Sequence, residues 1–344
     1  MKRLTIPELV AASRVDNELD TAGVPHDPLL VVDLDGQDWS DVHALRSAVA
    51  LLRQARTLVT VGFATQPLPA MANPLLDVLS CTLAPEAVGC AWIAGGHVEL
   101  AQISATIKGA PTAAVTLVGV LDLTTSRRVP DGLVAESLAY SMLLAGPEFR
   151  SWRARTAAGP VSPDPDPVLV DRKGDELIVT LNRPHRHNAF SRSIRDGLLE
   201  ALFVAQTDES VRRILLRGSG PSFCSGGDLD EFGLATSTPG SHVIRLQLSA
   251  ASAIHRLADK MRVEVHGACI GAGIELPSFA GRIEAQAGSW FMLPELRMGL
   301  IPGAGGTVGI TKRIGRWRTA YMALAGVPVD LDTALEWGLV DVRS

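Results

Sequence analysis

Short apolar runs alternate with longer amphipathic segments in the second half of the chain. The runs at 168–170 and 177–181 flank the turn Lys173-Gly174-Asp175 and predict two short strands. From Ser191 to Ala205, apolar residues recur at helical spacing behind a serine that can cap the first turn, which predicts a helix. Further strands are predicted at 213–217 and 263–266, and further helices at 228–232, at 243–257 and from about Gly273. This order predicts an α/β fold of ββα units around a largely parallel sheet.

The first half of the chain shows the same alternation. It predicts strands at 29–34, 58–63, 88–94 and 113–121, and helices at 41–55, 75–83, 98–107 and 132–144. Because the order and spacing parallel those of the second half, we interpret the first half as a diverged, trimmed copy of the same fold. An unrelated α/β module is the alternative interpretation.

A proline-rich segment separates the two halves. Residues 159–167 contain four prolines among nine residues, which forbids a helix and disfavours a paired strand. We therefore predict an N-terminal unit at 1–158, a linker at 159–167 and a second unit at 168–344.

Composition narrows the class of protein. The 344 residues are 47% hydrophobic and 20% charged, which is enough apolar material for two buried cores. A net charge of −5 without a long basic block argues against nucleic-acid binding. The four cysteines lack metal-ligand spacing and are expected to be free thiols. No secretory signal and no run of about 18 apolar residues is found, so we expect a cytoplasmic protein without a membrane segment.

Two turns rich in glycine and alanine follow strands in the second half. They are Phe223-Cys224-Ser225-Gly226-Gly227-Asp228-Leu229 and His266-Gly267-Ala268-Cys269-Ile270-Gly271-Ala272-Gly273-Ile274-Glu275. Such turns allow backbone N–H groups to approach a ligand and direct the positive end of a helix dipole toward it. One N–H from each turn would form an oxyanion hole for a carbonyl oxygen that gains negative charge.

Two glutamates lie among apolar neighbours close to these turns. Glu275 begins an apolar helix, and Glu295 follows Pro294. An apolar surrounding is expected to raise the pKa of a carboxyl group, which suits a general acid or base near neutral pH. Each glutamate also has a purely structural interpretation. Glu275 would stabilise the helix N-terminus through its charge, and Glu295 would be a surface residue in a turn.

Together with Asn182-Arg183-Pro184, Asn188-Ala189 and the stretch Ile301-Pro302-Gly303-Ala304-Gly305-Gly306-Thr307, these segments resemble the crotonase (enoyl-CoA hydratase/isomerase) superfamily. The resemblance covers about 168–342. It implies a crotonase-like ββα superhelix in the second unit and an acyl-CoA thioester as substrate.

The resemblance also implies a role for each matching position. Glu275 and Glu295 would be the catalytic pair of an enoyl-CoA hydratase, which adds water syn to a 2-enoyl-CoA, and the N–H groups of Gly227 and Ala272 would form the oxyanion hole. Contacts to the substrate would come from Ala189, Ser225, Gly226, Asp228, Leu229 and Gly271. The chemistry needs no metal or redox cofactor, and a homotrimer or hexamer is expected.

Three departures from the family pattern stand out. Pro277 comes just after Glu275, where the family has an unbroken helix. The chain stops soon after Asp341, where the family continues with two or three helices that cover the CoA site, and we expect the N-terminal unit to supply that cover. The stretch 233–247 is predicted to be a mobile loop over the acyl pocket.

Three alternatives to a hydratase stay open. They are an isomerase or other CoA enzyme that uses Glu295 alone, a cofactor-free oxygenase, and a non-catalytic subunit that stabilises a partner.

Overall fold

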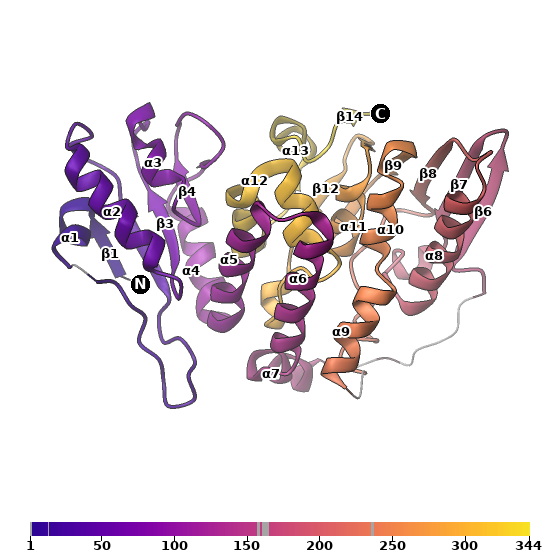
Figure 1. The fold of residues 1–344 in the computed structure, drawn as a ribbon, viewed down its shortest axis with the longest axis horizontal. Helices are drawn as coiled ribbons and strands as arrows, with labels where there is room; N and C mark the ends of the chain where they lie inside the picture. Colours follow the sequence, from indigo (N-terminus) through magenta and orange to yellow (C-terminus); the bar gives the residue numbers. More distant parts are fainter. Residues whose placement is uncertain (1, 13, 157–158, 160–164, 235–236) are drawn as a thin grey trace.

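The computed structural model describes residues 2–12, 14–156, 159, 165–234 and 237–344. It is elongated, with one β-sheet at each end and a layer of helices between them (Figure 1). The predicted linker, 159–167, lies mostly outside the described residues.

The C-terminal half contains a six-stranded sheet in the order β14-β11-β9-β8-β7-β6, in which every neighbouring pair is parallel except β6 and β7. A small second sheet has the order β10-β12-β13. The strands are β6 (Val168–Lys173), β7 (Glu176–Leu181), β8 (Arg213–Gly218), β9 (Met261–Val265), β10 (Ala268–Ile270), β11 (Arg282–Ala285), β12 (Trp290–Met292), β13 (Val329–Asp330) and β14 (Val342–Arg343). The predicted largely parallel sheet is confirmed.

The helices of this half lie between the strands in sequence. They are α8 (Arg192–Thr207), α9 (Thr238–Gln247), α10 (Ala250–Arg256), α11 (Ala272–Glu275), α12 (Gly306–Ala325) and α13 (Leu331–Trp337). Ser191 caps α8 as predicted, because its side chain accepts the N–H of Ile194.

The N-terminal half begins with a five-stranded parallel sheet in sequential order. Its strands are β1 (Lys2–Thr5), β2 (Leu29–Asp33), β3 (Val59–Phe63), β4 (Cys81–Ala84) and β5 (Ile93–Ala94). Its helices are α1 (Ile6–Ala11), α2 (Val42–Gln54), α3 (Asn73–Leu76), α4 (His97–Gly109), α5 (Pro111–Thr125), α6 (Val129–Leu144) and α7 (Pro147–Arg155). Whether this half is a diverged copy of the other remains a hypothesis.

The predicted strand at 113–121 is wrong, because these residues form helix α5. The helix is apolar on nearly all sides and is largely buried, so its sequence lacks the polar face that reveals most helices. Pro111 suits its first turn, where the missing N–H needs no partner.

Other boundaries also differ from the prediction. The expected helix at 75–83 is one turn, α3, followed by strand β4, and the expected strand at 88–94 shrinks to β5. The predicted helix at 228–232 is a turn, and the one at 243–257 is divided into α9 and α10. Much of the predicted mobile loop at 233–247 is helix α9, while residues 235 and 236 lie outside the described residues.

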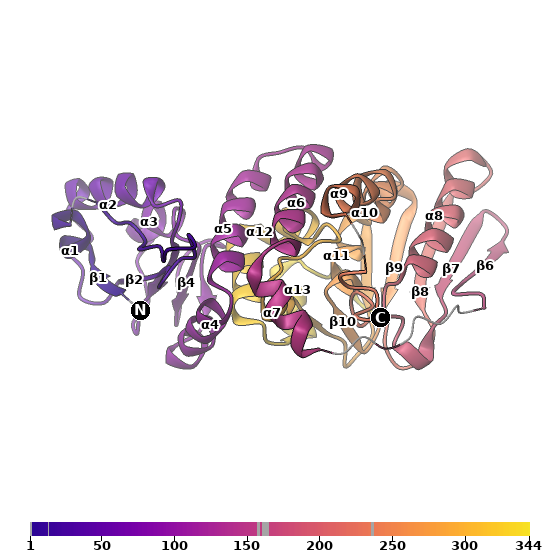
Figure 2. The same ribbon diagram turned by 90° about the horizontal axis from the view of Figure 1, so that it is seen from below.

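One apolar core runs through both halves. Helices α5 and α6 lie beside α12 in both views (Figures 1 and 2), and Leu117, Leu121 and Val308 belong to the same buried cluster. A second, smaller cluster lies on the outer side of the N-terminal sheet. The helices that precede the proline-rich segment therefore pack against the second half of the chain.

Within the described ranges, no single helix is long and apolar enough to cross a bilayer. Only α4 and α5 taken together, which meet at a bend of 110°, reach that length and apolarity.

Candidate active site

The two glycine-rich turns lie side by side. Cys224 and Cys269 form an isolated parallel bridge, and the N–H of Ile270 donates to the Cys224 carbonyl at 3.0 Å. Gly273 packs so closely on the Cys224 carbonyl that a Cβ there would overlap it. Glycine is therefore required for the close approach that brings the two predicted oxyanion donors to one pocket.

The predicted donors are the N–H groups of Gly227 and Ala272. Both residues line the pocket, and neither N–H donates to an acceptor within the described part of the chain. Ala272 begins helix α11 with a negative φ, so its methyl group is accommodated without strain. The oxyanion hole that the two amides would form stays a prediction.

Asn188 and Arg183 hold the first of these turns in place. The Asn188 amide donates to the carbonyl oxygens of Ser222 and Phe223, and its own oxygen accepts the Arg183 N–H. Arg183 forms a buried ion pair with Asp228 at 2.8 Å. The Asp228 carboxylate, predicted to contact the substrate, is thus committed to fixing the turn.

Glu275 is almost fully buried, with 3% of its surface exposed. Its Oε2 atom accepts the N–H groups of Ala304 and Gly306 at 2.8 and 2.9 Å. Burial raises the pKa of Glu275 to about 7, and these two hydrogen bonds oppose the rise. Helix α11 ends at Glu275 and Pro277 begins a new turn, so the proline does not displace the glutamate.

Glu295 is the second buried carboxyl group, with 7% of its surface exposed. Its Oε2 atom has no hydrogen-bond partner among the described residues. Burial raises its pKa well above the ordinary value, and the charges of Glu275 and Glu136 raise it further. These surroundings therefore favour the protonated form of Glu295.

Gly271 separates the two carboxyl groups. The position that its Cβ would occupy is 2.5 Å from Glu295 Oε1 and 3.7 Å from Glu275 Oε1. Its backbone has a φ of 50° and a ψ of −119°, a conformation that favours glycine. The space between the two carboxyl groups thus depends on the absence of a side chain at 271.

A third buried carboxyl group, Glu136, comes from helix α6 in the N-terminal half. It accepts the N–H groups of Gly305 and Thr307 and the Thr307 hydroxyl, at 2.7–3.0 Å. Burial and the charge of Glu275 raise its pKa to about 8, against these hydrogen bonds. Sequence reasoning missed this residue.

A signal for Glu136 was present in the sequence. Leu133, Glu136, Tyr140 and Leu144 recur at helical spacing and form one face of α6. A carboxylate within an otherwise apolar stripe indicates a buried partner.

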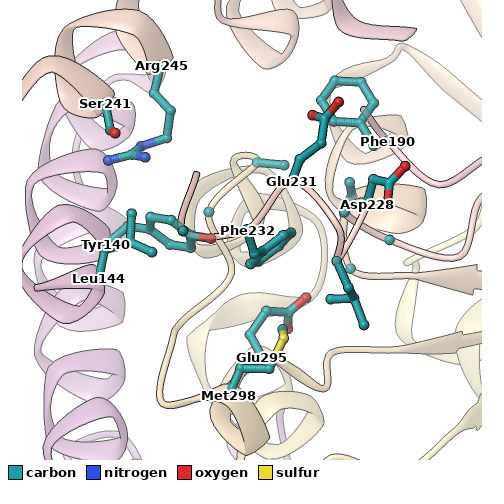
Figure 3. Close-up of a pocket in the computed structure, with 18 of the residues that line it drawn as sticks. Tyr140, Leu144, Phe190, Asp228, Glu231, Phe232, Ser241, Arg245, Glu295 and Met298 are labelled. Atoms are coloured by element: carbon teal, nitrogen blue, oxygen red, sulfur yellow. The ribbon is translucent and has the colours of Figure 1, made fainter. Parts of the chain in front are cut away.

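A pocket of about 1300 Å³ joins these groups (Figure 3). This exceeds the roughly 300–1,000 Å³ of most small-molecule sites. Helices α6 and α7 contribute Tyr140, Phe149 and Trp152 to its wall. The expectation that the N-terminal unit covers the pocket agrees with this arrangement.

Most of the predicted substrate contacts line the pocket. They are Ser225, Gly226, Asp228, Leu229 and Gly271. Ala189 is the exception, because it is buried outside the lining and its neighbour Phe190 faces the pocket instead. Among the described residues, no group of three His, Cys, Asp or Glu side chains could hold a metal ion.

Comparisons with known proteins assign the C-terminal half of the chain to a family. The family model described as enoyl-CoA hydratase/isomerase matches residues 174–342. The 2,3-dehydroadipyl-CoA hydratase of Escherichia coli K12 is 31% identical over 173 residues, which cover 50% of this chain and 67% of that protein. The 1,2-epoxyphenylacetyl-CoA isomerase of the same organism is 31% identical, covering 48% and 64%.

Two further matches cover a similar share of this chain. The mevalonyl-coenzyme A hydratase of Beauveria bassiana is 32% identical, and the match spans 48% of this chain but only 62% of that relative. A crystal structure of an enoyl-CoA hydratase from Mycobacterium smegmatis is 31% identical and covers 52% of this chain and 70% of that one, with a TM-score of 0.48. Through its C-terminal half, the chain belongs to the enoyl-CoA hydratase/isomerase family, the crotonase superfamily.

Proposed function

We propose that the protein is an enoyl-CoA hydratase, which adds water syn across the double bond of a 2-enoyl-CoA thioester. The proposal rests on one observation. Two buried carboxyl groups, Glu275 and Glu295, face the space beside Gly271, next to the free N–H groups of Gly227 and Ala272. A pair of carboxyl groups can hold one water molecule and exchange two protons with it and the substrate.

The surroundings of the two carboxyl groups assign their roles. Glu275 accepts two backbone N–H groups, which favours its ionised form, so it serves as the base that takes a proton from water. Glu295 has no hydrogen-bond donor to Oε2 among the described residues, and burial raises its pKa, so it serves as the acid.

Protons and bonds balance in this scheme. The water oxygen bonds to the β-carbon while its proton passes to Glu275. The proton of Glu295 passes to the α-carbon, and the carbon–carbon double bond becomes a single bond. A proton transfer from Glu275 to Glu295 restores the starting state.

The two free amides stabilise the charge that develops during the reaction. As water attacks the β-carbon, negative charge moves to the thioester oxygen and forms an enolate. Donors held in place before the reaction need no reorganisation, and each contributes roughly 10²–10³ in rate. The hydrogen bonds between the two turns keep Gly227 and Ala272 in that position.

An isomerase is the second candidate. It is favoured by the similarity to the 1,2-epoxyphenylacetyl-CoA isomerase, which is as identical to this chain as the dehydroadipyl-CoA hydratase. Such an enzyme would move one proton along the acyl chain with Glu295 alone. Full activity of Glu275→Gln with a 3-enoyl-CoA would favour it.

The test is a screen of crotonyl-CoA and of longer and aromatic 2-enoyl-CoAs. Loss of the conjugated thioester absorbance, with 3-hydroxyacyl-CoA identified by mass spectrometry, is the expected result. Glu275→Gln and Glu295→Gln should each lower kcat roughly 10²–10⁴-fold. Oxygen consumption with an arylacetyl-CoA would support an oxygenase instead, and absence of acyl-CoA binding by calorimetry would support a non-catalytic subunit.

A further inference from the structure

Arg245 lies where two helices from opposite halves of the chain meet over the pocket. It belongs to α9 and reaches α6, where its Nε atom donates to the Ser137 hydroxyl at 3.1 Å and its Nη2 atom donates to the hydroxyl of Ser141. Its guanidinium carbon lies 4.7 Å from the centre of the Tyr140 ring. These contacts fix the plane and direction of the guanidinium group.

Arg245 forms no close ion pair with a carboxylate of the described residues, although the charge of Glu136 favours its protonated form. The nearest acid on α6, Glu136, has both oxygens bound by residues at the start of α12. The Nη1 atom donates to no described group, and it is not among the fully buried polar atoms. Because Arg245 lines the pocket, this end of the guanidinium group is open to a ligand.

Partial burial of the Arg245 charge costs free energy when no ligand is bound. Desolvation lowers the pKa of Arg245, and the charges of Tyr140 and Glu136 oppose this shift only in part. A partly desolvated guanidinium is stabilised best by a carboxylate, which it binds through parallel N–H groups.

Two other arginines at the pocket have partners of their own. Arg153 donates to the Leu229 carbonyl, and Arg195 pairs with Asp196. Through its contact with Leu229, Arg153 lies beside the turn that is predicted to hold the CoA moiety. Arg245 differs because its neighbours are Tyr140 and Ser241, away from that turn.

Figure 3 shows where Arg245 lies relative to the reacting groups. Arg245, Tyr140 and Ser241 lie on one side of the pocket, Asp228 and Phe190 lie on the other, and Phe232 and Glu295 lie between them. If the turn that contains Asp228 holds the CoA moiety, an acyl chain that passes Glu295 ends at Arg245.

We propose that Arg245 binds a carboxylate at the far end of the acyl chain, so that the preferred substrates are CoA thioesters of unsaturated dicarboxylic acids. This inference rests on the proposed hydratase function and names its substrate class. Tyr140 would pack against the last methylene groups while Arg245 Nη1 donates to the carboxylate.

The experiment compares 2-enoyl-CoAs matched in chain length, one series ending in a methyl group and the other in a carboxylate. The wild-type protein should prefer the carboxylate series by roughly 10–100-fold in kcat/KM, as expected for a hydrogen bond between charged groups. Arg245→Gln should remove that preference and change the rate with the methyl series only slightly. The matched variant Arg153→Gln should weaken both series equally, because Arg153 lies on the predicted CoA side.

The outcomes separate the two proposals. Hydration of both series at equal efficiency would overturn the substrate class and leave the hydratase function standing. If neither series is hydrated, the hydratase function is wrong, and calorimetry with saturated acyl-CoAs of both series then tests the carboxylate subsite. Equal affinity for the two series would overturn the subsite. Tighter binding of the carboxylate series, lost in Arg245→Gln, would support it. If Arg245→Gln proves unstable, Arg245→Lys replaces it in the test. This variant keeps the charge and should retain part of the preference.

Discussion

Glu136 and Glu275 accept hydrogen bonds from alternate N–H groups at the start of helix α12, although they come from opposite halves of the chain. Glu275 binds the amides of Ala304 and Gly306, and Glu136 binds those of Gly305 and Thr307. Carboxylates are favoured at a helix N-terminus, where free N–H groups and the helix dipole meet. The N-terminal half therefore helps to position one of the two proposed catalytic carboxyl groups.

We expect Glu136→Gln to lower kcat by about tenfold, equivalent to about 1.4 kcal/mol of barrier. Burial and the charge of Glu275 raise the pKa of Glu295, and the charge of Glu136 adds to them, so its removal lowers that pKa. Since the acid must be protonated, the alkaline limb of the pH–rate profile should move to lower pH. Asp131→Asn, which changes a half-exposed acid on the same helix, should leave the profile unchanged. An unshifted alkaline limb in Glu136→Gln would contradict this coupling.

Stability should fall as the pH rises through neutrality. The pKa values of Glu136 and Glu275 are raised from 4.5 to about 8 and about 7 in the folded protein. The folded state then holds protons that the unfolded state releases, so this stabilisation is present below pH 4.5 and is lost by about pH 8. We expect the free energy of unfolding in urea to drop by at least about 1.4 kcal/mol over that range. The double variant with both residues changed to Gln should show a flatter dependence.

Gly271→Ala should abolish activity by filling the space between the proposed catalytic carboxyl groups. The added methyl group would lie 2.5 Å from Glu295 Oε1, and the φ of 50° adds strain. We expect kcat to fall at least about 10²-fold. Gly288→Ala is the matched control, because Gly288 also has a positive φ but its Cβ would meet nothing within 4 Å. That variant should lose stability and keep its rate.

A fragment of residues 160–344 should be poorly soluble and inactive. Without the first half, the faces of α12 that pack on α5 and α6 would be exposed, and the pocket would lose Tyr140 and Phe149 from its wall. Coexpression of residues 1–158 should restore solubility and activity in part. A soluble fragment with full activity would show that the N-terminal half is dispensable.

Chelation should leave the rate unchanged, because the proposed proton transfers use only Glu275 and Glu295. Dialysis against EDTA followed by the absorbance assay checks this expectation. A loss of activity that added Mg²⁺ or Zn²⁺ restores would contradict a metal-free reaction.

Local sequence patterns revealed much of this site, and contacts between distant segments hid the rest. Gly227, Ala272, Glu275 and Glu295 lie in short segments that resemble the crotonase superfamily, and that resemblance implied that they would lie together. The apolar stripe around Glu136 indicated a buried carboxyl group but not its partners, because these lie in the other half of the chain.

Two smaller errors have equally physical causes. Helix α5 was mistaken for a strand because a helix buried on nearly all sides has no polar face. Ala189 was expected at the substrate because of the family resemblance, which does not show which of two neighbouring side chains faces the pocket. Phe190 takes that place.

The shared core of α5, α6 and α12 has a consequence for how the protein is made. A ribosome releases α5 and α6 well before α12, by roughly 10–30 s at ordinary rates of synthesis. During that interval their apolar faces lack the surface that covers them in the finished protein. The apolar faces of α5 and α6 therefore stay exposed, or bound by a chaperone, until the last quarter of the chain emerges.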